Sequence, residues 1–536
     1  MRPLHRAILP LCLGLLSSLS MGQNLAVQER GRLLGAGLDP GDQSGSAVCI
    51  SGDTLVLGAP FDSDAFAQAG AAYVFVESSS GWIEEAKLGA SDAAAFSTFG
   101  EALSLSGDTL IVGASGDGEN GSFAGAAYVF TRTGSSWTQE AKLLANDGAA
   151  NDLFGFAVAL DGDTAVVGAW LDDDAGTSSG SAYVFVRTGG LWSQQAKLLS
   201  TDLADRDNFG EVVAISGDTI VCGARHDDDD GLSSGSAYAF VRSGNNWNQQ
   251  TKFVASDGAS FDTFGCSVAI SGDTALVGAC LEDEGGMNAG AAYVFQRSGG
   301  SWSQQAKLLA EDASGGDRFG SALSIDGESA LIGASFADLS APAVVAAGAA
   351  YVFQRSAFFF WNQQFKLSAS DAGADDRFGE SVFLDGERFA VGAGLWDDES
   401  TSSLDNGTAY AFQRGPAASV VARQGGSNPN SLDADDPVLG ASLQVTVDLG
   451  TTGHSSAALY AYSAPANLSL SGGQVLLVGG VQLFKLPLSS GGQVVFDAQV
   501  PNDLALLGAT IHLQALHLLG VQPFALSNAL ELSAGF

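Results

Sequence analysis

One phrase returns at a fixed interval along this chain of 536 residues, and that repetition restricts the possible folds more than any other feature. Residues 261–280 read "FDTFGCSVAISGDTALVGAC", and residues 206–225 read "RDNFGEVVAISGDTIVCGAR". Ser44-Gly45 marks an earlier, degenerate copy, so the chain contains seven units, and a period of this length is typical of propellers and other repeat arrays. The glycine of the Phe-Gly dipeptide recurs every 55 residues and once after 59, at Gly100, Gly155, Gly210, Gly265, Gly320 and Gly379.

Each unit contains four short segments with the pattern of β-strands. In the fifth unit, residues 264–271 (FGCSVAIS) alternate apolar and small side chains, which favours a half-buried strand. A Gly-Asp turn follows, and residues 275–279 (ALVGA) predict a short buried strand. Residues 291–297 (AAYVFQR) and 302–309 (WSQQAKLL) predict a third and an outer strand. Four strands per unit make one propeller blade, so we expect an all-β, seven-bladed β-propeller.

A tyrosine and a phenylalanine stand two residues apart in every unit. A spacing of two places both rings on one face of a strand, where they can pack against the adjoining blade. Burial of each ring is worth roughly 1.5–3 kcal/mol. The pairs are Tyr73/Phe75, Tyr128/Phe130, Tyr183/Phe185, Tyr238/Phe240, Tyr293/Phe295, Tyr351/Phe353 and Tyr410/Phe412.

The seventh unit lacks a fourth strand, because its third strand runs into "YAFQRGPAAS" at residues 410–419. The missing segment is at the other end of the chain, where residues 29–34 (ERGRLL) are in register with residues 139–144 (QEAKLL). We therefore predict that the N-terminus supplies the outer strand of the last blade and closes the ring, which removes open sheet edges.

The units resemble the FG-GAP repeat, in the Phe-Gly dipeptides, in the "VGA" segments and in "VLGAP" of the first copy, which contains Pro60. The resemblance covers residues 25–414 and implies the seven-bladed propeller of integrin α subunits, a fold that also occurs in many secreted bacterial proteins. We assign the propeller to residues 23–414. The resemblance is specific for the fold and much less so for function.

The same resemblance implies Ca²⁺ in an Asp-rich loop between the first two strands of a repeat. This chain has only "SGDT" or "DGDT" there, and one carboxylate on a tight turn cannot supply the six to eight oxygens that Ca²⁺ needs. The calcium role is therefore not transferred to these aspartates, which we expect to hydrogen-bond the turn. They are Asp53, Asp108, Asp163, Asp218 and Asp273.

A second acidic pattern follows one loop later, where two carboxylates stand two residues apart. Such pairs point to the same side of an extended loop and could hold a hard cation, with calcium the candidate; the alternative is a solvated acidic loop. The predicted ligands are Asp172, Asp174, Asp227, Asp229, Glu282 and Glu284. Two further sets of aspartates precede the Phe-Gly, each in six of the seven units, and we expect them to cap backbone N–H groups. They are Asp42, Asp152, Asp207, Asp262, Asp317 and Asp376, and Asp92, Asp147, Asp202, Asp257, Asp312 and Asp371.

The net charge and the N-terminal segment indicate which partners are excluded and where the protein is located. The chain has 60 acidic against 23 basic side chains, a net charge of −37, which opposes binding to nucleic acid and to anionic membranes. Residues 1–22 combine two arginines, an apolar stretch and small residues before Gln23, the pattern of a secretory signal peptide. No later segment has 18 consecutive apolar residues, so we expect a secreted or cell-surface bacterial protein without a transmembrane segment.

Four cysteines follow the signal segment, too few for a disulfide framework in a chain of this size. Cys49 and Cys222 replace small apolar residues of the repeat, and we expect them to be buried. Cys266 and Cys280 flank one hairpin turn. A three-residue turn would align them for a disulfide and a two-residue turn would leave them out of register, so the sequence leaves their bridging open.

A second domain is predicted after the propeller. Residues 415–436 read as a linker, and residues 437–536 contain six or seven short strand-like runs, which suggest a β-sandwich. Residues 500–518 (VPNDLALLGATIHLQALHL) resemble part of a terminal module found in many secreted bacterial proteins, for which the resemblance implies a role in sorting or surface retention.

The chemistry of the chain favours binding over catalysis. The sequence contains no HExxH, Walker or paired CxxC motif, and nearly every acidic residue recurs by repeat. We therefore expect a monomeric, non-catalytic adhesion-type scaffold for an extracellular protein or polysaccharide. The alternatives are a carbohydrate-active hydrolase that uses carboxylates and a structural envelope protein. Phe358, Phe359 and Phe360 are the predicted contact patch, unless their insertion packs on the C-terminal module.

Overall fold

The computed structural model describes residues 25–340, 343–356, 360–397 and 405–416, together with nine strands of the C-terminal part. These residues form strands and turns and no helix. The chain divides into two compact units, Val27–Gly415 and a second one that contains Pro416–Phe536. The predicted signal peptide, and Phe358 and Phe359 of the predicted contact patch, lie outside the described residues.

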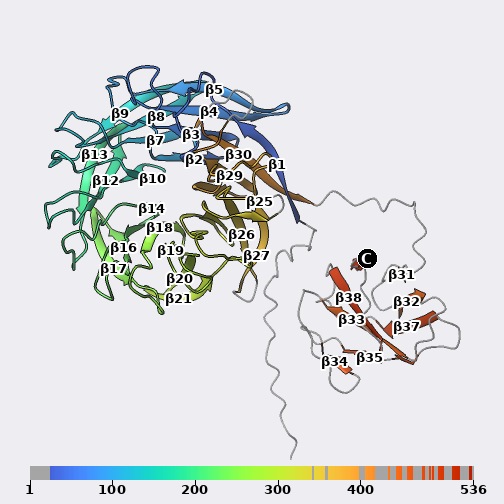
Figure 1. The fold of residues 1–536 in the computed structure, drawn as a ribbon. Coiled ribbons are helices and arrows are strands. Elements are labelled where there is room, and N and C mark those ends of the chain that lie inside the picture. The colour runs from blue at the N-terminus through green and yellow to red at the C-terminus, as the bar shows by residue number, and fades with distance from the viewer. Residues whose placement is uncertain are drawn as a thin grey trace, which may run out of the picture. The chain divides into compact units, whose positions relative to one another are not determined.

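The first unit contains seven four-stranded antiparallel sheets arranged as the blades of a propeller (Figure 1). The inner strands of blades 1 to 7 are β2 (Ala47–Ser51), β6 (Leu103–Ser106), β10 (Ala157–Asp161), β14 (Val213–Ser216), β18 (Phe264–Ser271), β22 (Ala322–Asp326) and β28 (Ser381–Asp385). The second strands are β3 (Thr54–Ala59), β7 (Thr109–Ala114), β11 (Thr164–Ala169), β15 (Thr219–Ala224), β19 (Thr274–Ala279), β23 (Ser329–Ala334) and β29 (Arg388–Ala393).

The two outer positions of the blades are filled in the same order. The third strands are β4 (Ala71–Ser78), β8 (Ala126–Thr133), β12 (Ser181–Thr188), β16 (Ser236–Ser243), β20 (Ala291–Ser298), β26 (Ala349–Arg355) and β30 (Thr408–Pro416). The outer strands are β5 (Gly81–Leu88), β9 (Ser136–Leu143), β13 (Leu191–Leu198), β17 (Asn246–Phe253), β21 (Ser301–Leu308), β27 (Trp361–Leu367) and, in blade 7, β1 (Leu25–Leu33). Blade 6 also contains the short pair β24 (Leu339–Ser340) and β25 (Ala343–Val344).

The ring closes through its first strand, as predicted. β1 pairs with β30, so the last blade combines the two ends of the propeller sequence. Arg30 Nε donates to Gln413 Oε1 at 2.9 Å, and Thr408 Oγ1 donates to the carbonyl of Leu33 at 2.6 Å. Ser370 Oγ also donates to Glu29 Oε1 at 2.9 Å. The inner strand β28 of blade 7 lies against β2 of blade 1, so the closure extends to the axis of the ring.

Two glycines of each unit are required by the close approach of neighbouring blades. A Cβ atom on Gly168, at the end of β11, would lie 1.9 Å from the carbonyl oxygen of Gly210. Gly210 has a φ of +85° and its N–H donates to the carbonyl of Gly223 at 2.9 Å. The same contact closes the ring, because a Cβ on Gly392 would lie 1.9 Å from the carbonyl oxygen of Gly45. The repeated glycines are therefore the backbone contact between blades.

The hydrophobic core lies between blades and confirms the role predicted for the paired aromatics. Tyr183 is fully buried and Phe185 is 4% exposed. Both pack against apolar side chains of blade 2, including Val129. The Phe154 ring meets the Tyr183 and Phe185 rings edge-on, with centroids 5.4 and 5.9 Å apart. Each such aromatic pair adds about 0.5–1.5 kcal/mol to the stability gained from burial alone.

Nine strands belong to the C-terminal part and pair antiparallel. One sheet has the order β31-β32-β37, another the order β36-β33-β38-β39, and β34 pairs with β35. Their bounds are β31 (Leu432–Ala434), β32 (Ser442–Asp448), β33 (Ser456–Tyr462), β34 (Gln474–Leu476), β35 (Gln482–Phe484), β36 (Leu486–Pro487), β37 (Gln493–Gln499), β38 (Thr510–Leu518) and β39 (Leu530–Ser533). The β-sandwich assigned to residues 437–536 stays a prediction.

Candidate functional site

The propeller has two chemically different faces. Because neighbouring strands of a blade are antiparallel, the connections between strands 1 and 2 and between strands 3 and 4 lie at one end, which we call the turn face. The connections between strands 2 and 3, and those that lead to the next blade, lie at the other end, which we call the loop face. Long loops held on a rigid scaffold are the usual place for binding residues.

On the turn face, one ring of hydrogen bonds links the inner strands. A Ser or Asp side chain at the end of each inner strand accepts from a glycine N–H in the turn of the next blade, at 2.6–3.4 Å. The acceptor and donor pairs are Asp385 with Gly52, Ser51 with Gly107, Ser106 with Gly162, Asp161 with Gly217, Ser216 with Gly272, Ser271 with Gly327 and Asp326 with Gly386. This face therefore uses its polar side chains to hold the ring together.

A small pocket lies at the turn-face end of the axis. Its volume is about 220 Å³, and its lining includes Leu105, Phe383 and Asp385. Ligand sites usually have volumes of about 300–1,000 Å³, so this pocket is small for an organic ligand. Asp385 is already engaged in the ring of hydrogen bonds.

Three aspartates of the tight turns, Asp163, Asp218 and Asp273, form ion pairs beside this ring. Asp163 Oδ1 accepts from Arg187 Nε at 2.6 Å, and Asp273 Oδ1 accepts from Arg297 Nε at 2.6 Å. The turns that contain them have two residues, and these carboxylates bond an arginine on the third strand of their own blade. The expectation that they hydrogen-bond the turn is thus incomplete, because a guanidinium on the neighbouring strand is the stronger partner.

On the loop face, the acidic pairs predicted to bind metal surround a lysine. In blade 3, Lys197 Nζ lies 2.8 Å from Asp172 Oδ2, 2.6 Å from Asp174 Oδ2 and 3.0 Å from Asp147 Oδ2. Tyr183 also donates to Asp172 at 2.7 Å. Burial alone would raise the pKa of the Asp172 carboxyl, but the hydrogen bonds from Lys197 and Tyr183 outweigh burial and lower it. The Lys197 ammonium group thus supplies the positive charge that pairs with these carboxylates.

The six predicted ligands occupy three separate clusters, one in each of three neighbouring blades. Asp227 and Asp229 surround Lys252, at 2.8 and 2.6 Å from Nζ. Glu282 and Glu284 surround Lys307, each at 2.8 Å from Nζ. The structure therefore brings the members of each pair together and does not bring different pairs together.

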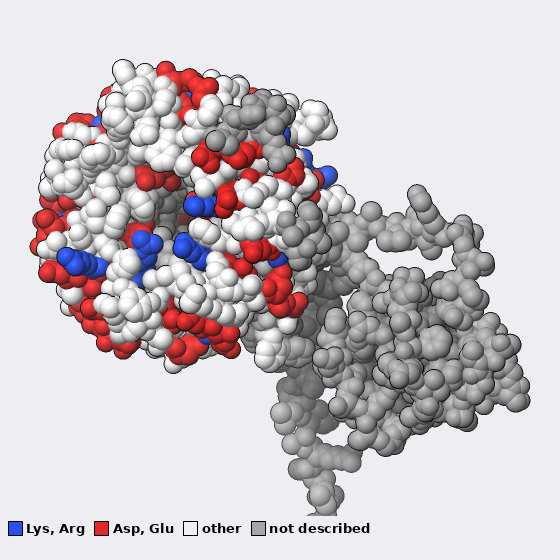
Figure 2. Space-filling model, viewed as in Figure 1, with Lys and Arg blue, Asp and Glu red and all other residues white. Residues whose placement is uncertain are grey.

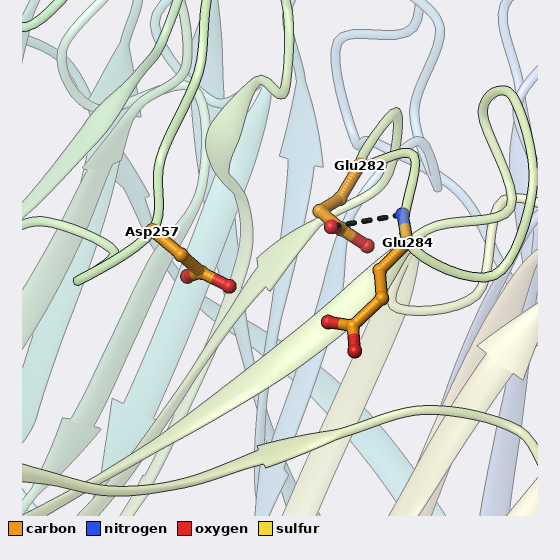
Figure 3. Close-up of side chains that lie close together, drawn as sticks. All are labelled: Asp257, Glu282 and Glu284. Atoms are coloured by element: carbon orange, nitrogen blue, oxygen red, sulfur yellow. Dashed lines mark hydrogen bonds between the residues drawn. The ribbon is translucent and has the colours of Figure 1, made fainter.

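The cluster in blade 5 has the geometry closest to a metal site. Figure 3 shows Asp257 opposite Glu282 and Glu284, and one oxygen from each lies within 4.8 Å of the others. Lys307 Nζ contacts all three residues, with Asp257 at 2.7 Å. A divalent cation would have to displace this ammonium group, and three carboxylates would still need further oxygens to satisfy Ca²⁺. Calcium binding stays a prediction, and Lys307 is its competitor.

The buried aspartates that precede each Phe-Gly cap the backbone, as predicted for one of the two sets. Asp152 Oδ2 accepts from the backbone N–H of Ala149 at 2.7 Å, and its equivalents do the same in other blades. Burial raises the pKa of the Asp152 carboxyl to about 6. The other set serves mainly the lysine clusters, because Asp147 and its equivalents accept from lysine Nζ.

The loop that leads into each Phe-Gly has two positions in the left-handed backbone conformation, two and four residues before the glycine. Four residues before the glycine, φ lies between +65° and +97° in all seven repeats. Glycine, asparagine and aspartate adopt this conformation most easily. They occupy four of the seven repeats, whereas Phe96 and Phe261 occupy two others with φ of +66° and +74°. The seven residues are Gly41, Phe96, Asn151, Arg206, Phe261, Gly316 and Asp375.

Phe96 and Phe261 are exposed, and the backbone of each contacts a loop of the preceding blade. Phe96 is 52% and Phe261 is 58% exposed. The Phe96 N–H donates to the carbonyl of Ala67, and the Phe261 N–H donates to the carbonyl of Leu232, each at 2.8 Å. We name as apolar patch 1 the residues Phe66, Phe96 and Phe123, on loops of blades 1 and 2, and as apolar patch 2 the residues Leu232, Phe261 and Met287, on loops of blades 4 and 5.

Exposed apolar side chains gather on the loop face. Of the 13 large apolar side chains that are exposed among the described residues, ten are on loop-face connections. They are Leu34, Phe66, Phe96, Phe123, Leu199, Leu232, Val254, Phe261, Met287 and Val345. Figure 2 shows acidic side chains spread over the visible face of the propeller, so apolar groups of this kind lie on a strongly acidic body.

Phe360, the one described residue of the contact patch predicted at residues 358–360, is on the other face. Phe360 is 69% exposed in the hairpin between β26 and β27, and its carbonyl accepts from the Ser356 N–H at 2.7 Å. That hairpin belongs to the turn face. Sequence reasoning missed Phe96 and Phe261, although the signal was present. Their position holds Gly, Asn or Asp in most repeats, which marks a left-handed conformation where phenylalanine is costly.

Comparison with known proteins agrees with the repeat count. Among the residues that the structure describes, no helix is long and apolar enough to cross a membrane. No curated protein matches the chain. The family model described as the FG-GAP repeat matches seven times, at residues 28–75, 82–130, 137–185, 192–240, 247–295, 302–353 and 361–412.

Each match after the first begins at the outer strand of one blade and ends in the third strand of the next. The sequence repeat is therefore offset from the blade by one strand, which is why the first match must supply the outer strand of the last blade. Seven matches, one closed ring and glycines at every contact between blades agree with one another. This chain belongs to the FG-GAP repeat family.

Proposed function

We propose that this protein is a secreted or cell-surface, non-catalytic binding scaffold, and that its loop face binds an extracellular protein or polysaccharide. The observation that carries the proposal is the conformation and exposure of Phe96 and Phe261. Both side chains are more than half exposed, and both are held at positive φ.

The energy of these two residues is unfavourable within the propeller itself. A non-glycine residue in the left-handed conformation costs roughly 1–2 kcal/mol. An exposed phenyl ring also forgoes most of the gain from burial, so the fold explains the backbone conformation at this position but not the choice of phenylalanine there. A partner that covers one ring, at about 100 Å² of apolar area, would gain about 2.5 kcal/mol. Strained and exposed side chains of this kind are typical of contact sites.

The surroundings of the apolar patches restrict the chemistry of the partner. Asp64, Asp229 and Glu284, on loops of the same face, have side chains that are 57–59% exposed. A strongly acidic surface repels polyanions and accepts neutral or basic groups. The partner is therefore a neutral polysaccharide, which offers sugar faces to the phenyl rings, or a protein with apolar and basic side chains.

The distribution of non-repeating acids supports a role without catalysis. Glu101, Glu211 and Glu380 follow the Phe-Gly of blades 2, 4 and 7, and burial raises the pKa of each carboxyl. No two of them are in neighbouring blades. A glycosidase needs two carboxyl groups about 5–10 Å apart across one bond, so these three are a poor basis for hydrolysis.

The test replaces each phenylalanine with the asparagine that the third repeat has at the same position. Phe96→Asn and Phe261→Asn should leave the stability unchanged or raise it by about 1 kcal/mol, because the strain is relieved. Both variants should lose binding when the protein is tested against a panel of neutral polysaccharides and immobilised extracellular proteins.

The matched control is Arg206→Asn, which changes the same exposed left-handed position without removal of an aromatic ring. It should keep full binding. The proposal fails if both phenylalanine variants bind as well as the wild type, or if the wild type binds nothing on the panel. It also fails if the purified protein degrades a polysaccharide.

A further inference from the structure

The seven repeats have different side chains at two positions on the loop face. One position follows the Phe-Gly, and the other follows the Gly-Ala that ends the second strand. The other blades have Ser46, Glu101, Phe156, Glu211, Ser321 and Glu380 at the first position, and Pro60, Ser115, Trp170, Arg225, Ser335 and Gly394 at the second. In blade 5 both positions hold cysteine, Cys266 and Cys280.

A bulge in β18 brings these two cysteines together. The turn after β18 has two residues, which alone would leave the cysteines out of register. Phe264 pairs with Ala279 and Val268 with Val277, so the intervening residues of β18 are displaced from the ladder. As a result, the Cys280 N–H donates to Cys266 Sγ at 3.2 Å, and the two thiols are hydrogen-bonded to each other.

The two sulfur atoms have polar partners, and their residues are partly exposed. Thr263 Oγ1 lies 3.4 Å from Cys280 Sγ, and Cys266 Sγ donates to the carbonyl of Gly320 at 3.7 Å. Both cysteines are unbridged and partly exposed. Cys49 and Cys222, in contrast, are fully buried in apolar surroundings, and burial raises the pKa of both thiols.

The pair lies in an electropositive spot of a protein that is otherwise strongly acidic. The neighbouring Cys266 thiol lowers the pKa of the Cys280 thiol, with further contributions from Thr263, Arg225 and Arg318. Arg225 Nε is held 2.9 Å from Glu211 Oε2, and Arg318 stacks on Phe336 at 4.2 Å. Reactive cysteines occur in such partly exposed, positively charged surroundings, whereas structural cysteines are buried and inert.

We propose that Cys266 and Cys280 form a redox-active dithiol on the loop face of blade 5, which hydrogen peroxide oxidises to a disulfide bond. The Cys280 thiolate attacks one oxygen of the peroxide, the O–O bond breaks, and a sulfenic acid and one water form after protonation. Cys266 Sγ then attacks Cys280 Sγ, the S–O bond breaks, and a second water leaves with the Cys266 proton. The two thiols together give up two electrons and the peroxide accepts them.

The first experiment compares the four cysteines within one protein. Native wild-type chain is treated with iodoacetamide at pH 7, before and after hydrogen peroxide, and modified peptides are quantified by mass spectrometry. Cys280 should be alkylated at least tenfold faster than Cys49 and Cys222. Peroxide should join the peptides of Cys266 and Cys280, with a loss of about 2 Da, and dithiothreitol should restore both thiols.

Serine variants separate the roles of the two thiols and do not disturb the fold, because blade 6 has serine at both positions. Cys280→Ser should abolish the rapid reaction with peroxide. Cys266→Ser should keep it but stop at the sulfenic acid, which dimedone traps. The proposal is overturned if peroxide leaves Cys266 and Cys280 alkylatable, if Cys280→Ser reacts as fast as the wild type, or if Cys49 and Cys222 react at the same rate.

Discussion

The lysine at the centre of each acidic cluster allows a sharp test of what the acidic loops do. Replacement of Lys307 by methionine keeps the apolar stem and removes the ammonium group, which lies 2.7–2.8 Å from Asp257, Glu282 and Glu284. Glu282, with a side chain only 9% exposed, then loses its charged partner. Loss of one partner of a buried pair costs about 3–5 kcal/mol.

The expected cost is smaller here, because Asp257 and Glu284 are 45% and 59% exposed and water screens them. We expect the free energy of unfolding to fall by about 2–3 kcal/mol. A propeller of roughly 390 residues has an unfolding entropy of about 0.8 kcal/mol/K, so the melting temperature should fall by about 3 °C. Differential scanning calorimetry measures this shift directly.

Blade 6 provides the matched control. Among the residues that the structure describes, Lys366 has one carboxylate partner, Asp312 at 2.7 Å, and both side chains are partly exposed. Lys366→Met should therefore lower the melting temperature by about 1 °C or less. Equal losses for Lys307→Met and Lys366→Met, or no loss for Lys307→Met, would contradict the view that the acidic pairs are arranged around a lysine.

The same variant tests calcium. In Lys307→Met the three carboxylates are freed, so millimolar Ca²⁺ should raise the melting temperature of the variant, and EDTA should reverse the effect. The wild type should not respond, because the ammonium group occupies the site. A rise of several degrees in the wild type would instead support calcium binding by the native loops.

Two further predictions concern the contacts between blades and the buried aspartates. Gly168→Ala should destabilise the propeller by more than about 3 kcal/mol in chemical denaturation, since its Cβ would meet the Gly210 carbonyl, whereas Gly89→Ala, with nothing within 4 Å, should be neutral. Burial raises the pKa of four capping carboxyls from 3.8 to about 6, so the folded state takes up protons more readily than the unfolded state between these values. Their stabilising contribution is complete below pH 4 and is lost as the pH rises through 6. Unfolding at pH 5 should therefore need more denaturant than unfolding at pH 7. The variant Asp152→Asn should reduce that difference. The four residues are Asp42, Asp152, Asp207 and Asp376.

The fold could be predicted because the period of the repeat and the pattern within it indicate the number of blades and the strands of each blade. Spacing alone placed Tyr183 and Phe185 on one face of β12, and the absence of a fourth strand after Phe412 pointed to residues 29–34. Such features depend on period and local pattern, which a sequence displays directly. The caps made by Asp152 and its equivalents are local as well, since donor and acceptor are three residues apart.

The chemistry of the acidic loops could not be predicted in the same way, because its partners are distant in sequence. Lys197 is 50 residues from Asp147, so their contact requires neighbouring blades to be in place. One signal was available, since the five repeats with an acidic pair all have a lysine on the outer strand. The meeting of Cys266 with Cys280 depends on a bulge that alternation of side chains does not reveal.

The most direct test of the account is removal of the closing strand. A chain that lacks residues 23–36 loses β1, and with it the hydrogen bonds of Arg30 to Gln413 and of Thr408 to Leu33, so blade 7 keeps three strands and an open edge. Calorimetry should then show a lower and broader melting transition, accompanied by aggregation. A melting transition identical to that of the full chain would contradict closure of the ring by its first strand.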